Sequence, residues 1–132
     1  MQNSYSCNLT NASKLGVKLA NQISGGEVFG LIGPLGSGKT TFVKAFGKTL
    51  GIKQPIPSPT FAIWQHFKGK LPKTKKPLTL HHLDVYRLKD LNEFKYLGIE
   101  EYWGQKGSIT LIEWADLVKE SLPHNTTYVT FQ

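Results

Sequence analysis

The sequence predicts a single α/β domain in which helices pack against a mostly parallel β-sheet. Short apolar runs typical of buried strands alternate along the chain with segments of helical periodicity, and this alternation favours a layered α/β fold. A glycine-rich loop also stands between one such run and the helix that follows it. The length of 132 residues fits one domain, which we expect to extend over residues 1–132.

The first half of the chain contains two expected strands and two expected helices. A short strand is expected over Tyr5–Leu9, and a helix over residues 12–23, where apolar residues recur on one face. The apolar run 28–32 is typical of a buried parallel strand. A second amphipathic helix follows the glycine-rich loop over residues 39–50, and Gly51 is its natural stop.

The second half continues the alternation after a proline-rich loop over residues 51–59. Further strands are expected over residues 60–67, 78–86, 108–112 and 127–131, and further helices over 91–102 and 114–122. Gly98 predicts a break in the first of these helices, and Pro123 a stop after the second. The segment 68–77 is expected to be a basic, turn-rich connection.

Positive charge is concentrated in the first part of the chain. The net charge is +7; residues 1–80 hold eleven lysines and one acid, whereas residues 81–132 hold five basic and eight acidic residues. The N-terminal part should therefore attract phosphates, nucleotides, RNA or an acidic partner. Five lysines fall in the segment Lys68–Lys76, which is either a solvated loop or a docking segment. Arg87 is the single arginine.

Several classes of protein are excluded by composition. One cysteine, Cys7, allows neither an intrachain disulfide nor a cysteine-based zinc site. No apolar run approaches the ~18 residues that a membrane span needs. The first eight residues lack the charged and apolar regions of a signal peptide. A cytoplasmic protein without membrane contact is the expectation.

The glycine-rich loop fits the Walker A pattern, Gly33 followed after four residues by Gly38, Lys39 and Thr40. Its glycines allow backbone N–H groups to surround phosphate oxygens. The Lys39 ammonium is expected to reach the β- and γ-phosphates, and the Thr40 hydroxyl to bind Mg²⁺. The expected nucleotide-binding residues are Gly33, Leu35, Gly36, Ser37, Gly38, Lys39, Thr40 and Thr41. The alternative is a glycine-rich turn with a solvated lysine.

Two acidic residues are candidates for the Mg²⁺ end of the site. Glu113 closes the more continuously apolar run and is the predicted metal ligand; Asp84 follows a neighbouring strand and is expected to orient water or sense the γ-phosphate. The alternative for both is a strand-end acid that faces solvent. Thr60, in Ser58–Phe61, is expected either to contact the γ-phosphate or Mg²⁺ through its hydroxyl or to belong to a plain turn.

Four motifs in this order and at these spacings resemble the TsaE family, the bacterial ATPases of tRNA threonylcarbamoyladenosine biosynthesis. They are the glycine-rich loop Gly33–Thr41, Ser58-Pro59-Thr60-Phe61, His82-x-Asp84-x-Tyr86-Arg87 and Leu111-Ile112-Glu113-Trp114. The resemblance covers residues 5–131. The glycine-rich loop alone is generic, and its combination with the other three motifs is specific.

The resemblance implies a three-layer P-loop sandwich with antiparallel edge strands. It implies slow Mg²⁺-dependent ATP hydrolysis by the isolated chain. It also implies action with TsaD and TsaB, which transfer threonylcarbamoyl to adenosine 37 of tRNAs that read codons beginning with adenine. By position, Lys39 binds phosphate, and Thr40 and Glu113 hold Mg²⁺. Residues 58–61 and 82–87 resemble two switch regions, and Trp114 would report nucleotide occupancy by its fluorescence.

Two features depart from the family pattern. Pro34 removes one backbone donor early in the loop, where little loss of phosphate contact is expected. Relatives usually continue beyond the strand that precedes Gln132, so the adenine pocket is expected to be the least defined part of the site, with residues 8–12 as candidate lining.

Three other functions are compatible with part of the sequence. A small-molecule kinase of this fold carries an arginine-bearing lid, which a chain with one arginine does not provide. A GTPase would need an Asn-Lys-x-Asp motif for guanine, and the sequence has none. An RNA-binding module without enzymatic activity accounts for the charge but leaves the glycine-rich loop and both acids unexplained.

Overall fold

The strands of the described residues form one sheet in the order β1-β6-β2-β5-β4-β3. The computed structural model describes residues 4–34, 36–56 and 63–132. The strands are β1 (Ser4–Cys7), β2 (Val28–Ile32), β3 (Trp64–Lys70), β4 (Pro77–Asp84), β5 (Ser108–Glu113) and β6 (Thr127–Phe131). Neighbouring strands run parallel except at one edge, where β3 pairs antiparallel with β4. The expected mostly parallel sheet is confirmed.

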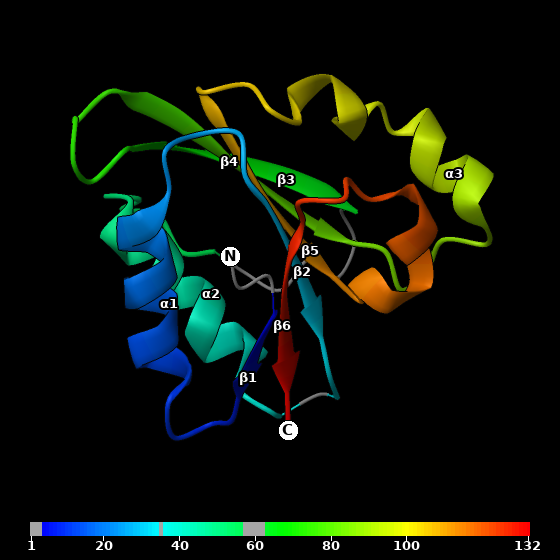
Figure 1. Ribbon diagram of the computed structural model, residues 1–132, viewed down its shortest axis with the longest axis horizontal. Coiled ribbons are helices and arrows are strands. Elements are labelled where there is room, and N and C mark those ends of the chain that lie inside the picture. The colour runs from blue at the N-terminus through cyan, green and yellow to red at the C-terminus, as the bar shows by residue number, and fades with distance from the viewer. Residues whose placement is uncertain (1–3, 35, 57–62) are drawn as a thin grey trace.

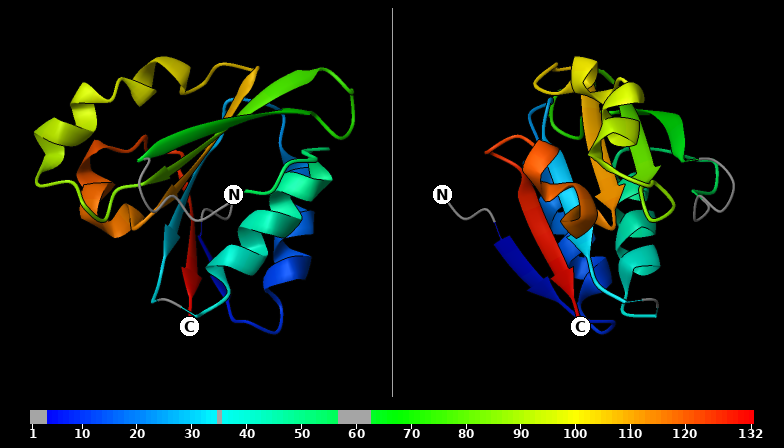
Figure 2. Two further views of the ribbon diagram at one scale, coloured as in Figure 1. Left: turned by 180° about the vertical axis from the view of Figure 1, so that it is seen from behind. Right: turned by 90° about the vertical axis from the view of Figure 1, so that its right-hand side faces the viewer.

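Helical segments cover both faces of the sheet and make three layers (Figure 1). The helices α1 (Ala12–Gln22) and α2 (Lys39–Thr49) lie side by side on one face. The short helix α3 (Leu91–Tyr96) and the 3₁₀ segments η1 (Ile99–Tyr102) and η2 (Ala115–Ser121) cover the other face (Figure 2). The predicted three-layer arrangement is therefore confirmed.

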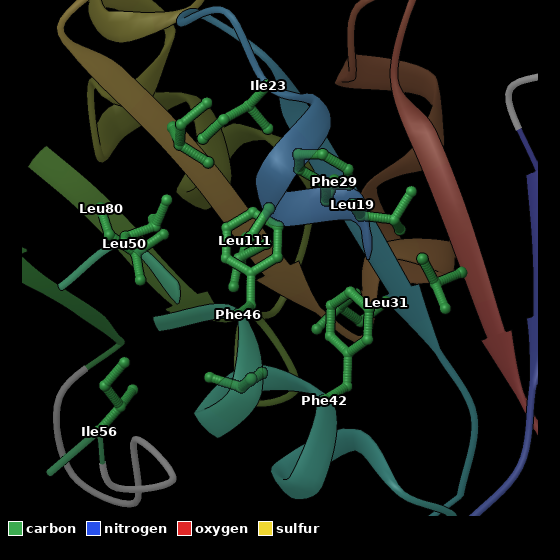
Figure 3. Close-up of a cluster of buried hydrophobic side chains, with 14 of the residues drawn as sticks. Leu19, Ile23, Phe29, Leu31, Phe42, Phe46, Leu50, Ile56, Leu80 and Leu111 are labelled. Atoms are coloured by element: carbon green, nitrogen blue, oxygen red, sulfur yellow. The ribbon is translucent and has the colours of Figure 1, made fainter. Parts of the chain in front are cut away.

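The larger of the two apolar cores lies between the sheet and the α1–α2 layer (Figure 3). Phe42 and Phe46 of α2 point at the sheet, and the ring of Phe46 meets that of Phe29 edge-on at 5.3 Å. Every residue of β5 is buried, as expected for a central parallel strand with both faces covered. This packing fixes α2, and with it the loop that precedes α2, against the ends of β2 and β5.

Three sequence predictions need correction. Residues 68–70 belong to β3 rather than to a loop, because Phe67 and Leu71 face the core while the lysines between them remain exposed. Residues 115–121 form a 3₁₀ segment, not an α-helix, with non-helical backbone at Val118. The expected helix 91–102 does break at Gly98, which has φ 78°, but its second half is also 3₁₀.

Candidate functional site

The glycine-rich loop joins the end of β2 to the start of α2, as the sequence predicts. Three of its residues have positive φ: Gly33 at 148°, Gly36 at 76° and Gly38 at 109°. A Cβ atom on Gly33 would lie 2.6 Å from the Phe131 carbonyl oxygen at the end of β6, so only glycine fits there. The predicted residue Leu35 lies outside the described residues.

The N-terminus of α2 is open to an anion. Gly38 provides no side-chain cap, and the first turn of α2 has no acidic residue. The first backbone N–H groups of α2 are therefore without a capping side chain, and no carboxylate of that turn compensates the positive end of the helix dipole. The Ser37 hydroxyl donates to the Pro34 carbonyl at 2.5 Å and closes the loop on itself. Pro34 therefore contributes a hydrogen-bond acceptor, its carbonyl oxygen, to the loop. These features fit a phosphate group at the start of α2.

Lys39 is the residue that fits phosphate most directly. Its side chain is buried, with 5% of the residue exposed, and its ammonium nitrogen has no hydrogen-bond partner among the described residues. The ammonium lies over the Trp114 ring, 4.3 Å from the ring centre. A buried cation without a hydrogen-bonded partner is costly, and an arriving phosphate oxygen would satisfy it.

A cavity of about 140 Å³ lies between the glycine-rich loop and the end of β5. Its lining residues are Leu9, Gly36, Gly38, Lys39, Thr40, Thr41 and Glu113. The lining includes five of the eight predicted nucleotide-binding residues, without Gly33 and Ser37, and it includes both predicted metal ligands, Thr40 and Glu113. Leu9 comes from the segment 8–12 that was proposed to line the adenine pocket.

The two predicted carboxylates are neighbours at the carboxyl ends of adjacent strands. Asp84 of β4 and Glu113 of β5 are paired in register, so their expected placement on neighbouring strands is confirmed. Glu113 is buried, and Asp84 is partly buried with Oδ1 accepting from the Tyr86 backbone N–H at 2.9 Å. Burial raises the pKa of Asp84, and the nearby Glu113 carboxylate raises it further, while the Tyr86 bond, His82 and Lys39 lower it.

A buried histidine holds Glu113, a contact that the sequence analysis did not identify. The His82 Nε2–H donates to Glu113 Oε2 at 2.6 Å, while His82 Nδ1 has no partner among the described residues. The signal for it was present in the strand periodicity. His82 and Asp84 share one face of β4, Glu113 lies on the same face of β5, and that face is turned to α2.

The residues present fit Mg²⁺ bound together with phosphate. Over residues 4–34, 36–56 and 63–132, no group of three His, Cys, Asp or Glu side chains gathers into a metal site. Mg²⁺ commonly uses one or two protein oxygens and completes its shell with phosphate oxygens and water. Thr40 and Glu113 can supply such oxygens. Thr60, whose hydroxyl was one further candidate to contact the γ-phosphate or Mg²⁺, lies outside the described part of the chain.

His81 belongs to the opposite layer, as its alternation with His82 predicts. Its Nδ1 accepts from the Trp64 indole N–H at 3.0 Å, and its ring stacks on Tyr102 with 4.4 Å between centres. Burial lowers the pKa of His81 to about 4. Arg87 is exposed and forms no ion pair with any described residue.

Comparison with known proteins gives a consistent result. A family model described as "Threonylcarbamoyl adenosine biosynthesis protein TsaE" matches residues 7–132. A Bacillus subtilis protein named tRNA threonylcarbamoyladenosine biosynthesis protein TsaE is 42% identical over 108 residues, which are 81% of this chain and 62% of the relative. A Treponema pallidum protein of the same name is 34% identical over 122 residues, 92% of this chain and 84% of the relative.

A solved structure shares the fold. The crystal structure of Bacillus subtilis YdiB superposes with a TM-score of 0.64 at 35% identity, and the match covers 88% of this chain and 66% of YdiB. This chain therefore spans less than two thirds of the length of both Bacillus proteins. Among the described residues, no helix has the length and apolar character needed to cross a bilayer.

Proposed function

Because the chain belongs to the TsaE family of threonylcarbamoyl adenosine biosynthesis proteins, we propose that it is a Mg²⁺-dependent ATPase of tRNA modification. The modification is formation of N6-threonylcarbamoyladenosine at position 37 of tRNAs that read codons beginning with adenine. The chain supports homologues of TsaD and TsaB, which carry out the transfer. Its place of action is the cytoplasm, where the tRNA substrate is found.

The observation that carries the proposal is the Lys39 ammonium, which is buried without a hydrogen-bond partner among the described residues. It lies in the cavity that the glycine-rich loop shares with Glu113. A cation kept in this state fits a ligand that brings its own negative charge, and the phosphates of ATP bring such charge.

Each residue of the site has a defined task in this proposal. The backbone N–H groups of residues 36–41 and the Lys39 ammonium bind the phosphates. Thr40 and Glu113 hold Mg²⁺, and His82 fixes the orientation of the Glu113 carboxylate. Asp84, next to Glu113, orients the attacking water. Bound MgATP supplies the phosphoanhydride bond whose cleavage drives the cycle.

Turnover by the isolated chain is expected to be slow. In the described part of the cavity, Lys39 is the cation that can neutralise charge on the transferred phosphoryl group. ATPases and GTPases of this type gain large rate factors from an added arginine, often supplied by a partner. We therefore expect the TsaD and TsaB homologues to stimulate turnover.

The test is the rate of ATP hydrolysis with and without Mg²⁺, first by the chain alone and then with TsaD, TsaB and tRNA from the same source. We expect slow turnover alone and faster turnover with the partners, and no turnover by Lys39→Ala. Unchanged turnover in Lys39→Ala would refute the assignment of the phosphate site. Fast turnover that depends on a small phosphate acceptor instead of the partners would indicate a kinase.

A further inference from the structure

The helical layer formed by α1 and α2 carries basic side chains without acidic ones. Its exposed lysines, here called the α1–α2 lysine face, are Lys14, Lys18, Lys44, Lys48 and Lys53. The sequence has no Asp or Glu from residue 28 to residue 83, and Glu27 is the single acid before that stretch. No carboxylate of α1 or α2 therefore neutralises these lysines.

The opposite layer carries acidic side chains together with basic ones, such as Lys95 of α3 and Lys119 of η2. Six acidic side chains lie in or beside α3, η1 and η2: Asp90, Glu93, Glu100, Glu101, Asp116 and Glu120. The sheet separates the two layers, so the molecule has one cationic face and one mixed to acidic face (Figure 1). An anionic macromolecule would be attracted to the α1–α2 side.

The lysine face is hollowed rather than flat. A hollow of about 530 Å³ lies between α1 and α2, and one of about 490 Å³ lies between the end of α2 and residues 51–56. Lys44 and Lys48 line both hollows, so the two adjoin along α2. Thr41 lines the first hollow and also the nucleotide cavity, which places the lysine face directly beside that cavity.

Helix stability explains only part of this charge pattern, namely Lys48 in the last turn of α2, where a cation favours the helix dipole. Lys14 and Lys18 are four residues apart on α1, and Lys44 and Lys48 are four residues apart on α2. Like charges at this spacing are neighbours on a helix surface and destabilise it. In addition, the first turn of α1 has no acidic residue, although one would favour the helix dipole. A binding role explains why cations stand at these positions.

We propose that the α1–α2 lysine face binds the phosphate backbone of an RNA stem. Among the residues that the structure describes, no aromatic side chain lines either hollow, so they provide no platform on which unpaired bases could stack. Flexible lysines fit phosphate oxygens and read no base sequence. Recognition of a helical stem by its backbone is the mode that these side chains allow. The inference rests on the proposed function only for the choice of tRNA as one probe.

The experiment measures RNA binding by the intact chain without ATP and without partner proteins. The probes are an unmodified tRNA transcript, an RNA hairpin of unrelated sequence and poly-glutamate, each titrated at several KCl concentrations. Each lysine–phosphate contact contributes about 0.7–0.9 to the slope of log K against log salt. Five contacts predict a slope near −4 for both RNAs, with weak binding to poly-glutamate.

Two triple variants with the same net charge locate the contacts. Lys44→Gln/Lys48→Gln/Lys53→Gln should lower the steepness of the slope by about 2–3 for both RNAs. The control, Lys89→Gln/Lys95→Gln/Lys106→Gln, removes three exposed lysines that lie outside α1 and α2 and should leave the slope near the wild-type value. The melting temperature of the first variant should equal or exceed that of the wild type, because a like-charge pair is removed.

Three results would overturn the proposal. One is equal weakening by both triple variants, which would make net charge rather than this face the cause. Another is an undetectable wild-type affinity for both RNAs at about 50 mM salt. The third is tighter binding to poly-glutamate than to RNA, which would assign the face to an acidic protein. None of these measurements depends on ATP hydrolysis. Failure of the RNA-binding proposal can therefore be distinguished from failure of the proposed ATPase activity.

Discussion

Replacing Lys39 by methionine should make the nucleotide-free protein more stable while abolishing its affinity for ATP. The Lys39 ammonium is buried and has no hydrogen-bond partner among the described residues; it lies 4.3 Å from the centre of the Trp114 ring and attracts the Asp84 carboxylate from a longer distance. Methionine keeps the unbranched chain and packs well against an aromatic ring, but it carries no charge to desolvate.

The expected gain follows from two opposing contributions. A buried polar group without a hydrogen bond costs about 1–3 kcal/mol, and a charged group costs more. A desolvated cation–π contact returns about 0.5–2 kcal/mol. The difference leaves the free energy of unfolding about 1 kcal/mol higher in Lys39→Met. With a urea m-value near 2 kcal/mol per molar, the midpoint should rise by about 0.5 M.

The assay is urea unfolding with and without MgATP, followed by circular dichroism. The wild type should gain about 2.7 kcal/mol when the nucleotide is present at 100 times its Kd, and Lys39→Met should gain nothing. Lys44→Met is the matched control, since Lys44 is exposed on the same helix; it should change stability by less than about 0.5 kcal/mol and retain the response to ATP. A lower midpoint for Lys39→Met than for the wild type would show that the ammonium is well paired in solution, and the reasoning would fail.

Four further predictions concern other residues. The folded state holds the pKa of His81 near 4, so the unfolded state binds more protons than the folded state between pH 6.5 and 4. Lowering the pH from 7.5 to 5 should therefore reduce the free energy of unfolding, measured in urea, by about 2 kcal/mol. An equal reduction in His81→Phe would contradict this. Glu113→Ala should reduce Mg²⁺-dependent hydrolysis far more than Mg²⁺-free nucleotide binding, whereas equal losses would indicate a folding role. Asp84→Ala should still bind ATP but lose partner-stimulated turnover, and an unaffected cycle would reduce Asp84 to a structural residue. Gly16→Ala should lower the melting temperature in a thermal scan despite the better helix propensity of alanine, because its Cβ would lie 2.7 Å from the Phe42 carbonyl oxygen; a higher melting temperature would mean that α1 and α2 separate easily.

The residues predicted for the phosphate cavity could be assembled from the sequence because local rules suffice there. The glycine spacing specifies a loop between a strand and a helix, and the two acids each end an apolar run. Parallel strands place their carboxyl ends at one edge of the sheet, so Asp84 and Glu113 meet without any further information. Their roles toward water and Mg²⁺ stay predictions.

The strand predicted from the sequence ends at residue 67, whereas β3 continues to Lys70. The charge of the lysines favoured a loop there, although the alternation of apolar residues favoured a strand. Lysines at 68 and 70 suggested a solvated loop, yet Phe67, Gly69 and Leu71 alternate with them and face the core. A strand at the edge of a sheet can expose one whole face, and lysine there also discourages pairing with another chain. Periodicity is therefore the stronger guide when the charged residues occupy every second position.

The contacts that complete the site lie beyond what periodicity can predict, and Trp114 is the clearest case. The chain turns directly after Glu113 by placing Trp114 at φ 62°, a left-handed conformation that costs free energy in a bulky residue. In this conformation the ring contacts the Lys39 ammonium on one side of the site and stacks on the exposed Tyr86 at 4.7 Å. No sequence rule places tryptophan in that region, because the surrounding structure and not its own propensity holds it there. The same left-handed residue is also the N-cap of the 3₁₀ segment η2, so Trp114 fixes where the chain turns as well as the contact with Lys39.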